Sequence, residues 1–193
     1  MNIPLNRPLV LASNSPRRRQ LLTDAGFKFT VEVRPTDELF PDEMLPIEVP
    51  AFLARHKAEQ FSKGIKEQLI LCADTIVVIN DSILNKPADD REAFEMLQSL
   101  SGTTHEVITG ICLLTNEYVI TKTDIAKVMF RQLTNKEIDF YVQSQKPFDK
   151  AGAYGIQEWI GMVGIERIEG SYYTIMGLPT HLVYQLLSPY FSR

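Results

Sequence analysis

The stretch Leu9-Val-Leu-Ala-Ser-Asn-Ser-Pro-Arg-Arg-Arg-Gln-Leu-Leu22 decides how the chain begins to fold. Its first four residues are apolar and predict a buried strand, and its last residues have the apolar spacing of a helix. Between them lies a Ser/Asn turn, in which Ser15 can cap a helix whose first residue is Pro16, because proline has no N–H to lose there. The stretch therefore predicts a strand, a tight turn and a helix in direct succession.

The first turn of this helix carries the basic run Arg17-Arg-Arg19, at a place where acidic residues are normally favoured. The start of this helix would then bring together three kinds of positive or donating group: free backbone N–H groups, the positive end of the helix dipole and guanidinium groups. Such a place suits a multiply charged anion, and phosphate is the obvious candidate. Because the net charge of the chain is −4, we expect a small anionic ligand rather than a nucleic acid.

Length and composition indicate one ordinary globular domain. A chain of 193 residues, 45% of them hydrophobic, can bury a full core, and we expect a single domain over residues 1–193. No apolar run reaches membrane-spanning length and the N-terminus does not resemble a signal peptide, so no membrane partner is expected. Cys72 and Cys112 lie in apolar runs without a CxxC spacing, which predicts reduced core thiols and a cytoplasmic location.

Strand-like and helical patterns alternate along the chain, which predicts an α/β fold with a mixed sheet flanked by helices. Strands are expected at residues 9–12, 29–33, 69–79, 106–114, 118–130 and 162–168, and helices at residues 16–25, 47–63, 90–100, 134–144 and 180–187. Thr134 and Glu137 have the spacing of a capping box, and residues 115–117 are expected to form a hairpin turn. The loop at residues 34–46, rich in proline and acidic residues, is expected to cover or border a site.

Asp74 interrupts an otherwise apolar strand. A carboxylate in such a run is costly unless it meets a metal, a cation or hydrogen-bond donors. Asp74 is therefore either a metal ligand or general base, or a residue at a strand end or bulge that ties down a neighbouring loop. The pair Asp37-Glu38 in the acidic loop could supply a second carboxylate. Two carboxylates, together with phosphate oxygens and water, describe a site for Mg²⁺ or Mn²⁺.

Two lysines and one small-residue stretch remain open to more than one interpretation. Lys57 lies at the edge of the apolar stripe of its helix, so it either extends its ammonium to water or points into a polar cleft. Lys86 lies in a loop, where a surface lysine is the default. Residues 147–157 are rich in small side chains that let the backbone approach a ligand. Tyr154 and Gln157 could read a flat base there, and a structural turn is the alternative.

Taken in order, nine short motifs resemble those of the Maf family of nucleoside triphosphate pyrophosphatases over nearly the whole chain. They are Leu11-Ala-Ser-Asn-Ser-Pro-Arg-Arg18, Asp37-Glu38, Lys57-Ala58, Ala73-Asp-Thr-Ile-Val77, Lys86-Pro87, Ser101-Gly-Thr-Thr-His105, Asp149-Lys-Ala-Gly-Ala-Tyr-Gly-Ile-Gln157, Gly170-Ser-Tyr172 and Gly177-Leu-Pro179. The resemblance implies hydrolysis of a nucleoside triphosphate to the monophosphate and pyrophosphate with a divalent metal. It also implies an elongated α/β fold of two lobes with the site in a central cleft, similar to the fold of inosine-triphosphatase-like enzymes that remove non-standard purine triphosphates.

The resemblance also implies roles for individual residues. The groups that it assigns to the phosphates are Ser13, Ser15, Arg17 and Arg18, and those that it assigns to catalysis are Asp74, Glu38, Lys57 and Lys86. Within the second set, the two carboxylates would bind the metal, and Asp74 would accept the proton of the attacking water. The two lysines would stabilise the negative charge that develops on the phosphates.

Base preference is implied by two further positions. Thr75 and Gln157 resemble the subgroup that acts on dTTP and UTP and is linked to modified pyrimidine triphosphates. Thr75, Gln157 and one of Arg17 or Arg18 would read the pyrimidine. A second subgroup, which prefers 7-methyl-GTP, departs at these positions. The family carries two arginines after Ser-Pro, whereas this chain has a third, Arg19.

Two other classes of function remain open at this point. A nucleotide-binding regulator of cell division without catalytic activity would use the same anion site, although such a binder gains nothing from two carboxylates unless a metal bridges them. A nucleic-acid-binding module is opposed by the net charge and by the lack of a basic stripe. We therefore expect a nucleoside triphosphate as the partner, no nucleic acid and no membrane, and a homodimer is compatible with this interpretation.

Overall fold

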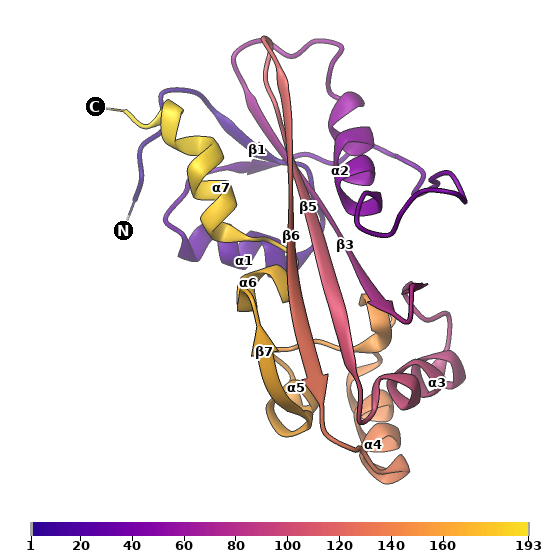
Figure 1. The fold of residues 1–193 in the computed structure, drawn as a ribbon. Coiled ribbons are helices and arrows are strands. Elements are labelled where there is room, and N and C mark those ends of the chain that lie inside the picture. The colour runs from indigo at the N-terminus through magenta and orange to yellow at the C-terminus, as the bar shows by residue number, and fades with distance from the viewer. Residues whose placement is uncertain (1, 193) are drawn as a thin grey trace. The chain divides into compact units, whose positions relative to one another are not determined.

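The computed structural model describes residues 2–192 as a mixed α/β fold (Figure 1). Its strands are β1 (Leu9–Leu11), β2 (Thr30–Val31), β3 (Leu69–Ile79), β4 (Ser82–Leu84), β5 (Thr104–Leu114), β6 (Val119–Phe130) and β7 (Ile165–Glu169). Its helices are α1 (Pro16–Asp24), α2 (Val49–Glu59), α3 (Asp90–Leu100), α4 (Asn135–Gln145), α5 (Trp159–Gly164), α6 (Tyr172–Ile175) and α7 (Thr180–Leu187), with short 3₁₀ turns η1 (Ala151–Ala153) and η2 (Ser188–Tyr190). Among residues 2–192, no helix is both long and apolar enough to cross a bilayer.

The strands form one mixed sheet in the order β2-β1-β3-β5-β6-β7, with β4 paired to β3. β1 pairs in parallel with both β2 and β3. The β3–β4 and β6–β7 pairs are antiparallel. The predicted α/β class with a mixed sheet and flanking helices is therefore confirmed.

The chain divides into two compact units. The first unit contains the chain up to Asp74, Thr109–Asp124 and the chain from Gly177 onward, and the second contains Thr75–Ile108 and Ile125–Met176. The chain therefore crosses from one unit to the other within β3, β5 and β6.

In the first unit, α2 packs on β1, β3 and β5. Ala54 and Ala58 of α2 are completely buried in a cluster with Cys72 of β3. Gly110 of β5 has no room for a side chain, because a Cβ there would lie 2.3 Å from the backbone nitrogen of Ala51. The small residues on both surfaces let the helix backbone approach the sheet closely.

Both cysteines are free and buried, as predicted. Burial raises the pKa of the Cys72 thiol, and it raises the pKa of Cys112 to about 12. Both side chains are therefore protonated, apolar core groups at neutral pH.

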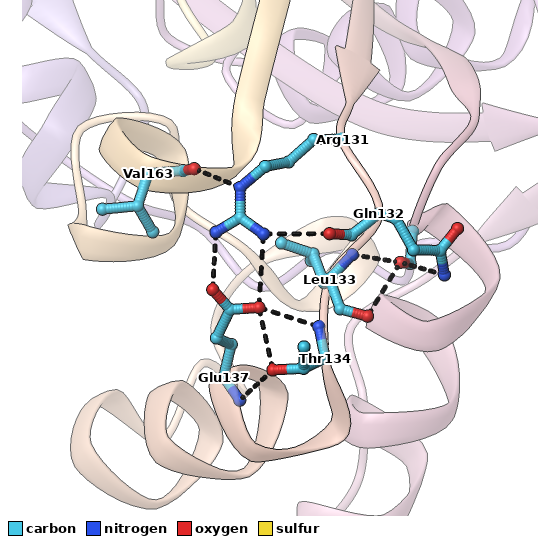
Figure 2. A network of polar contacts seen from close by, with 7 residues as sticks. Arg131, Gln132, Leu133, Thr134, Glu137 and Val163 are labelled. Carbon is cyan, nitrogen blue, oxygen red and sulfur yellow. Dashed lines mark hydrogen bonds and ion pairs between the residues drawn. The ribbon is translucent and has the colours of Figure 1, made fainter.

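In the second unit, α3, α4 and α5 surround the ends of the long strands. The core includes Leu97 of α3, Phe130 of β6, Tyr141 of α4 and Ile160 of α5, all at most 1% exposed. Its α4 begins with the predicted capping box, in which Thr134 and Glu137 bond reciprocally. The same carboxylate of Glu137 accepts two bonds from Arg131, at 2.6 and 3.2 Å (Figure 2).

This network makes one stability prediction. Arg131 and the hydrogen bonds from Thr134 lower the pKa of Glu137 to about 2, from an ordinary value of 4.5. A lowered carboxyl pKa contributes stability above the unfolded-state value, and this contribution is lost as the pH falls toward the folded-state value. The free energy of unfolding should therefore fall between about pH 4.5 and pH 2, and Glu137→Gln should show a shallower fall over that window.

Chemical denaturation at a series of pH values measures this difference. A matched control is Glu95→Gln, which removes an exposed carboxylate 3.5 Å from Arg91 on the surface of α3 and should leave the slope nearly unchanged. Parallel stability curves for the wild type and Glu137→Gln would contradict the prediction.

Most predicted elements are confirmed within a few residues, and one is partly wrong. The strand expected at residues 162–168 begins only at Ile165, because Met162–Gly164 complete α5. α2 is shorter than the predicted range of residues 47–63. The three-residue strand β4 and the short helix α6 have no counterpart among the predictions. The hairpin at residues 115–117 is confirmed, since Thr115 N donates to Tyr118 O at 2.9 Å.

Candidate active site

The N-terminus of α1 is built as the sequence predicts. Ser15 is the N-cap, and its Oγ accepts the backbone N–H of Arg18 at 3.4 Å, with Pro16 in the first helical turn. The Oγ of Ser13, a buried residue, accepts the N–H of Ser15 at 3.2 Å. No acidic residue lies in the first turn. The backbone donors of this helix end and the neighbouring guanidinium groups thus form a positive site suited to phosphate.

Arg18 ties three segments of the first unit together. Its Nε donates to Gly177 O at 2.8 Å, and one terminal nitrogen donates to Ala73 O at 2.8 Å. The same nitrogen lies 3.5 Å from Ser13 Oγ. Burial lowers the pKa of Arg18, whereas the nearby carboxylate of Asp74 raises it. The guanidinium therefore remains charged and joins α1 to β3 beside Asp74.

The two neighbouring arginines share the first turn of α1 with Arg18. Arg17, like Arg18, is half-buried. A terminal nitrogen of Arg19 donates to the side chain of Asn14 at 3.1 Å, so the third arginine contacts the Ser/Asn turn. The Nε of Arg19 is buried without a hydrogen-bond partner among residues 2–192.

Lys57 brings together two carboxylates that are far apart in the sequence. Its Nζ lies 2.9 Å from Glu38 Oε1 and also bonds to Asp74 Oδ1. The side chain of Lys57 is 18% exposed and that of Asp74 is 11% exposed, so their ion pair is largely shielded from water. The interpretation in which Lys57 extends into water is therefore wrong. Asp74 is not at a strand end either, because β3 continues to Ile79.

The acidic loop is held along α2 by neighbouring contacts. His56 Nε2 lies 3.7 Å from Asp37 Oδ1, so consecutive residues of α2 face the consecutive pair Asp37-Glu38. At the base of the loop, the Arg34 guanidinium lies 4.3 Å from the centre of the Phe61 ring. Glu38 of this loop contacts Lys57, which also bonds to Asp74. That the loop borders an active site stays a prediction. Neither Arg34 nor His56 was among the predicted site residues, because each is an unremarkable exposed type in the sequence.

Three predicted residues belong to the second unit. Thr75 follows Asp74 directly in β3 and is half-buried. Lys86 is exposed in the loop between β4 and α3. Gln157 lies in the turn before α5, and its Oε1 is buried without a hydrogen-bond partner among residues 2–192.

Gln157 lines a cavity of about 400 Å³ in the second unit, together with Met162, Ile168 and Tyr172. A mostly apolar cavity with one unsatisfied polar atom is typical of a small-molecule site. The apolar residues of α5, β7 and α6 that form it are spread over the sequence and gave no motif that could predict a cavity.

Tyr154 does not have the position that the sequence interpretation required. It is 6% exposed, and its hydroxyl lies 2.8 Å from His105 Nε2. The Tyr154 ring also packs edge-on against Phe130. Burial lowers the pKa of His105 to about 4, so the pair is neutral at physiological pH. Tyr154 is thus part of the core, and the expectation that its face reads a base is wrong.

The chain is similar to one protein family, and to individual relatives, over nearly its whole length. The family model described as Maf-like protein matches residues 8–190. A dTTP/UTP pyrophosphatase of Christiangramia forsetii is 46% identical over 183 residues, which cover 94% of this chain and 93% of that protein. One of Bacteroides fragilis is 47% identical over 181 residues, which cover 93% and 94%.

A solved structure, "Structure of a HAM1 protein from Coxiella burnetii", covers 95% of this chain and 99% of its own at 18% identity. Its TM-score of 0.49 is too low to support a conclusion. The family match needs no such support, because it extends over residues 8–190 and includes α1, Glu38, Lys57 and Asp74. The chain belongs to the Maf family.

Proposed function

We propose that this chain hydrolyses nucleoside triphosphates, above all dTTP and UTP, to the monophosphate and pyrophosphate. The observation that carries the proposal is the joining of Asp74 and Glu38 through Lys57 in the same unit as the basic N-terminus of α1. A site with phosphate-binding donors and an adjacent carboxylate can bind a triphosphate and accept a proton. The relatives at 46% and 47% identity carry the name dTTP/UTP pyrophosphatase.

The chemistry assigns one role to each group of residues. The α1 N-terminus, with Ser13, Ser15 and Arg17, holds phosphate oxygens. Asp74 accepts a proton from water as its oxygen forms a bond to the α-phosphorus. The bond from that phosphorus to the bridging oxygen then breaks, and pyrophosphate leaves with the bonding electrons. Lys57 holds the Asp74 carboxylate in place and keeps a positive charge beside it.

The residues present fit a divalent cation in part. Glu38 and Asp74 offer hard oxygen ligands that converge on one ammonium. Within residues 2–192, no group of three or more His, Cys, Asp or Glu side chains is placed to hold a metal ion. We infer that these two carboxylates would hold Mg²⁺ or Mn²⁺ only together with water and phosphate oxygens, as is usual for Mg²⁺. Bound there, the ion would supply charge neutralisation and a lower pKa for water.

Several further roles rest on the resemblance and stay proposals. Lys86 would stabilise charge on the phosphates, and Thr75 and Gln157 would read the base. The place of Gln157 on the lining of the cavity supports this role, because a side-chain amide can both donate to and accept from the edge of uracil or thymine. Both compact units would act as one functional domain, and this is supported by the family match over residues 8–190. A cytoplasmic location follows from the proposed substrate, and the assembly state is open to measurement.

A panel of nucleoside triphosphates tests the function directly. Pyrophosphate release should be greatest in kcat/KM for dTTP and UTP and lower for GTP and ATP, with Mg²⁺ or Mn²⁺ added. Because a site that hydrogen-bonds one base edge rejects bases that leave its groups unpaired, Gln157→Ala should reduce this preference by about tenfold.

Three results would change the conclusion. 7-methyl-GTP as the best substrate would overturn the pyrimidine preference and leave the pyrophosphatase activity intact. Tight nucleotide binding without any turnover would favour the non-catalytic regulator. Salt-sensitive oligonucleotide binding without nucleotide binding would point to a nucleic-acid-binding module.

A further inference from the structure

Gln157 is presented by a closed four-residue turn in the second unit. The backbone N–H of Glu158 donates to Gly155 O at 3.0 Å, so Ile156 and Gln157 occupy the central positions. The turn places Gln157 among the residues that line the 400 Å³ cavity. The orientation of its side-chain amide toward that cavity depends on how precisely the turn is held.

One tyrosine hydroxyl contacts both ends of this turn. Tyr141 of α4 is completely buried, and its hydroxyl oxygen accepts the backbone N–H of Gly155 at 3.1 Å. The same hydroxyl donates to Glu158 Oε2. Burial and the neighbouring Glu158 raise the pKa of Tyr141, so the hydroxyl keeps the proton that it donates. A single oxygen atom therefore bridges the first and last residues of the turn.

The far end of the turn has a second anchor. Glu158 Oε1 lies 3.1 Å from Lys150 Nζ, and the Lys150 side chain is only 9% exposed. At the near end, a Cβ on Gly155 would lie 2.8 Å from Glu158 Cδ and 3.0 Å from Gln157 Nε2. The amide of Gln157 thus packs directly beside the groups that Tyr141 holds, and the turn has little room to relax.

We propose that Tyr141 is a positioning residue for base selection, because its hydroxyl fixes the turn that orients Gln157. The inference rests on the proposed function, in which Gln157 contacts the base. The roles that the resemblance implies do not include Tyr141, Lys150 or Glu158. The turn lies apart in the chain from Ser13, Ser15 and Arg17, which hold phosphate oxygens in the proposed function and belong to the first unit.

Tyr141→Phe tests the proposal by removing one oxygen and keeping the ring. We expect the ratio of kcat/KM for dTTP to that for GTP to fall by about tenfold or more, since small misplacements of a contact group are costly. The inhibition constant of inorganic tripolyphosphate, which has no base, should stay within about twofold of the wild-type value, because the anion site is untouched. Tyr184→Phe is the matched control, since this exposed tyrosine of α7 has ring contacts with Phe27 and Phe191.

A second pair of variants covers the case in which Tyr141→Phe does not fold. Glu158→Gln keeps an oxygen that can accept the hydrogen bond from the Tyr141 hydroxyl, whereas Glu158→Ala does not. We expect the glutamine variant to retain most of the dTTP/GTP ratio and the alanine variant to lose it. An unchanged ratio in Glu158→Ala would overturn the proposal. So would an equal loss for both nucleotides accompanied by weaker tripolyphosphate inhibition.

Amide hydrogen exchange distinguishes failure of this inference from failure of the proposed function. The Gly155 amide should exchange at least about tenfold faster in Tyr141→Phe than in the wild type, because its acceptor is gone. Unchanged exchange would overturn the positioning role even in an active enzyme. If the wild type releases no pyrophosphate but its Gly155 amide exchanges slowly, the proposed function is overturned. The hydrogen bond from the Gly155 amide to the Tyr141 hydroxyl would then still stand.

Discussion

Replacing Asp74 by asparagine is expected to lower kcat for dTTP by about 10²-fold or more, because a general base of this kind contributes at least that much. Asparagine has nearly the same shape but cannot accept the proton of the attacking water. The fold should be retained, since Lys57 keeps its second carboxylate partner, Glu38, at 2.9 Å. Steady-state pyrophosphate release measures the loss, and a thermal unfolding scan checks the fold.

A matched control makes the Asp74 result specific. Asp81→Asn changes an exposed aspartate with a positive φ of 61°, in the turn between β3 and β4. Asparagine tolerates this backbone conformation well, so kcat and stability should both stay near wild type. A kcat within a few-fold of wild type in Asp74→Asn would remove Asp74 from the proposed mechanism.

The sequence predicted the elements of the fold best where local chemistry decides them. Ser15 and Pro16 define the start of α1, and Thr134 with Glu137 defines the start of α4, because each cap forms within a few residues of chain. The apolar runs of β3 and β5 are also long enough to be unambiguous.

Short elements were predicted poorly for a physical reason. Residues 162–168 alternate in a way that favours a strand, yet α5 continues through Gly164. A Cβ on Gly161 would lie 2.1 Å from Ile156 O, so α5 packs against the backbone of the turn before it, a contact that the hydrophobic pattern does not reveal. Tyr154 was misjudged for a related reason, because its partner His105 lies 49 residues away and sequence gives no measure of burial.

The candidate site was predictable as a set of residues but not as a set of contacts. Sequence spacing could not show that Lys57 bridges Glu38 and Asp74, since these carboxylates lie 19 and 17 residues from it. It also could not show that Arg18 reaches Gly177, which is 159 residues away. The roles of these residues in catalysis stay predictions that the variants proposed here will test.

The difference between Arg17 and Arg18 leads to the second large expected effect. Arg18→Ala should lower the free energy of unfolding by roughly 2–4 kcal/mol, because it removes two charge-assisted bonds worth about 1.5–3 kcal/mol each and water restores part of the loss. The bonds concerned are those to Ala73 O and Gly177 O, both at 2.8 Å. Arg17→Ala should cost less than Arg18→Ala, because it leaves these two bonds in place and alanine favours the helix.

Ligand affinity should fall in both variants, but for a different reason in each. Both variants should weaken binding of a non-hydrolysable dTTP analogue by roughly 1.5–3 kcal/mol in titration calorimetry, Arg17→Ala through a lost phosphate contact and Arg18→Ala through displacement of the α1 N-terminus from Ala73. Arg18→Lys should recover little stability, since an ammonium does not reproduce the planar fork that reaches two carbonyl oxygens at once. Equal unfolding free energies for Arg17→Ala and Arg18→Ala would show that the bonds to Ala73 and Gly177 do not hold α1 in place. In that case both arginines would have to be assigned to the ligand alone.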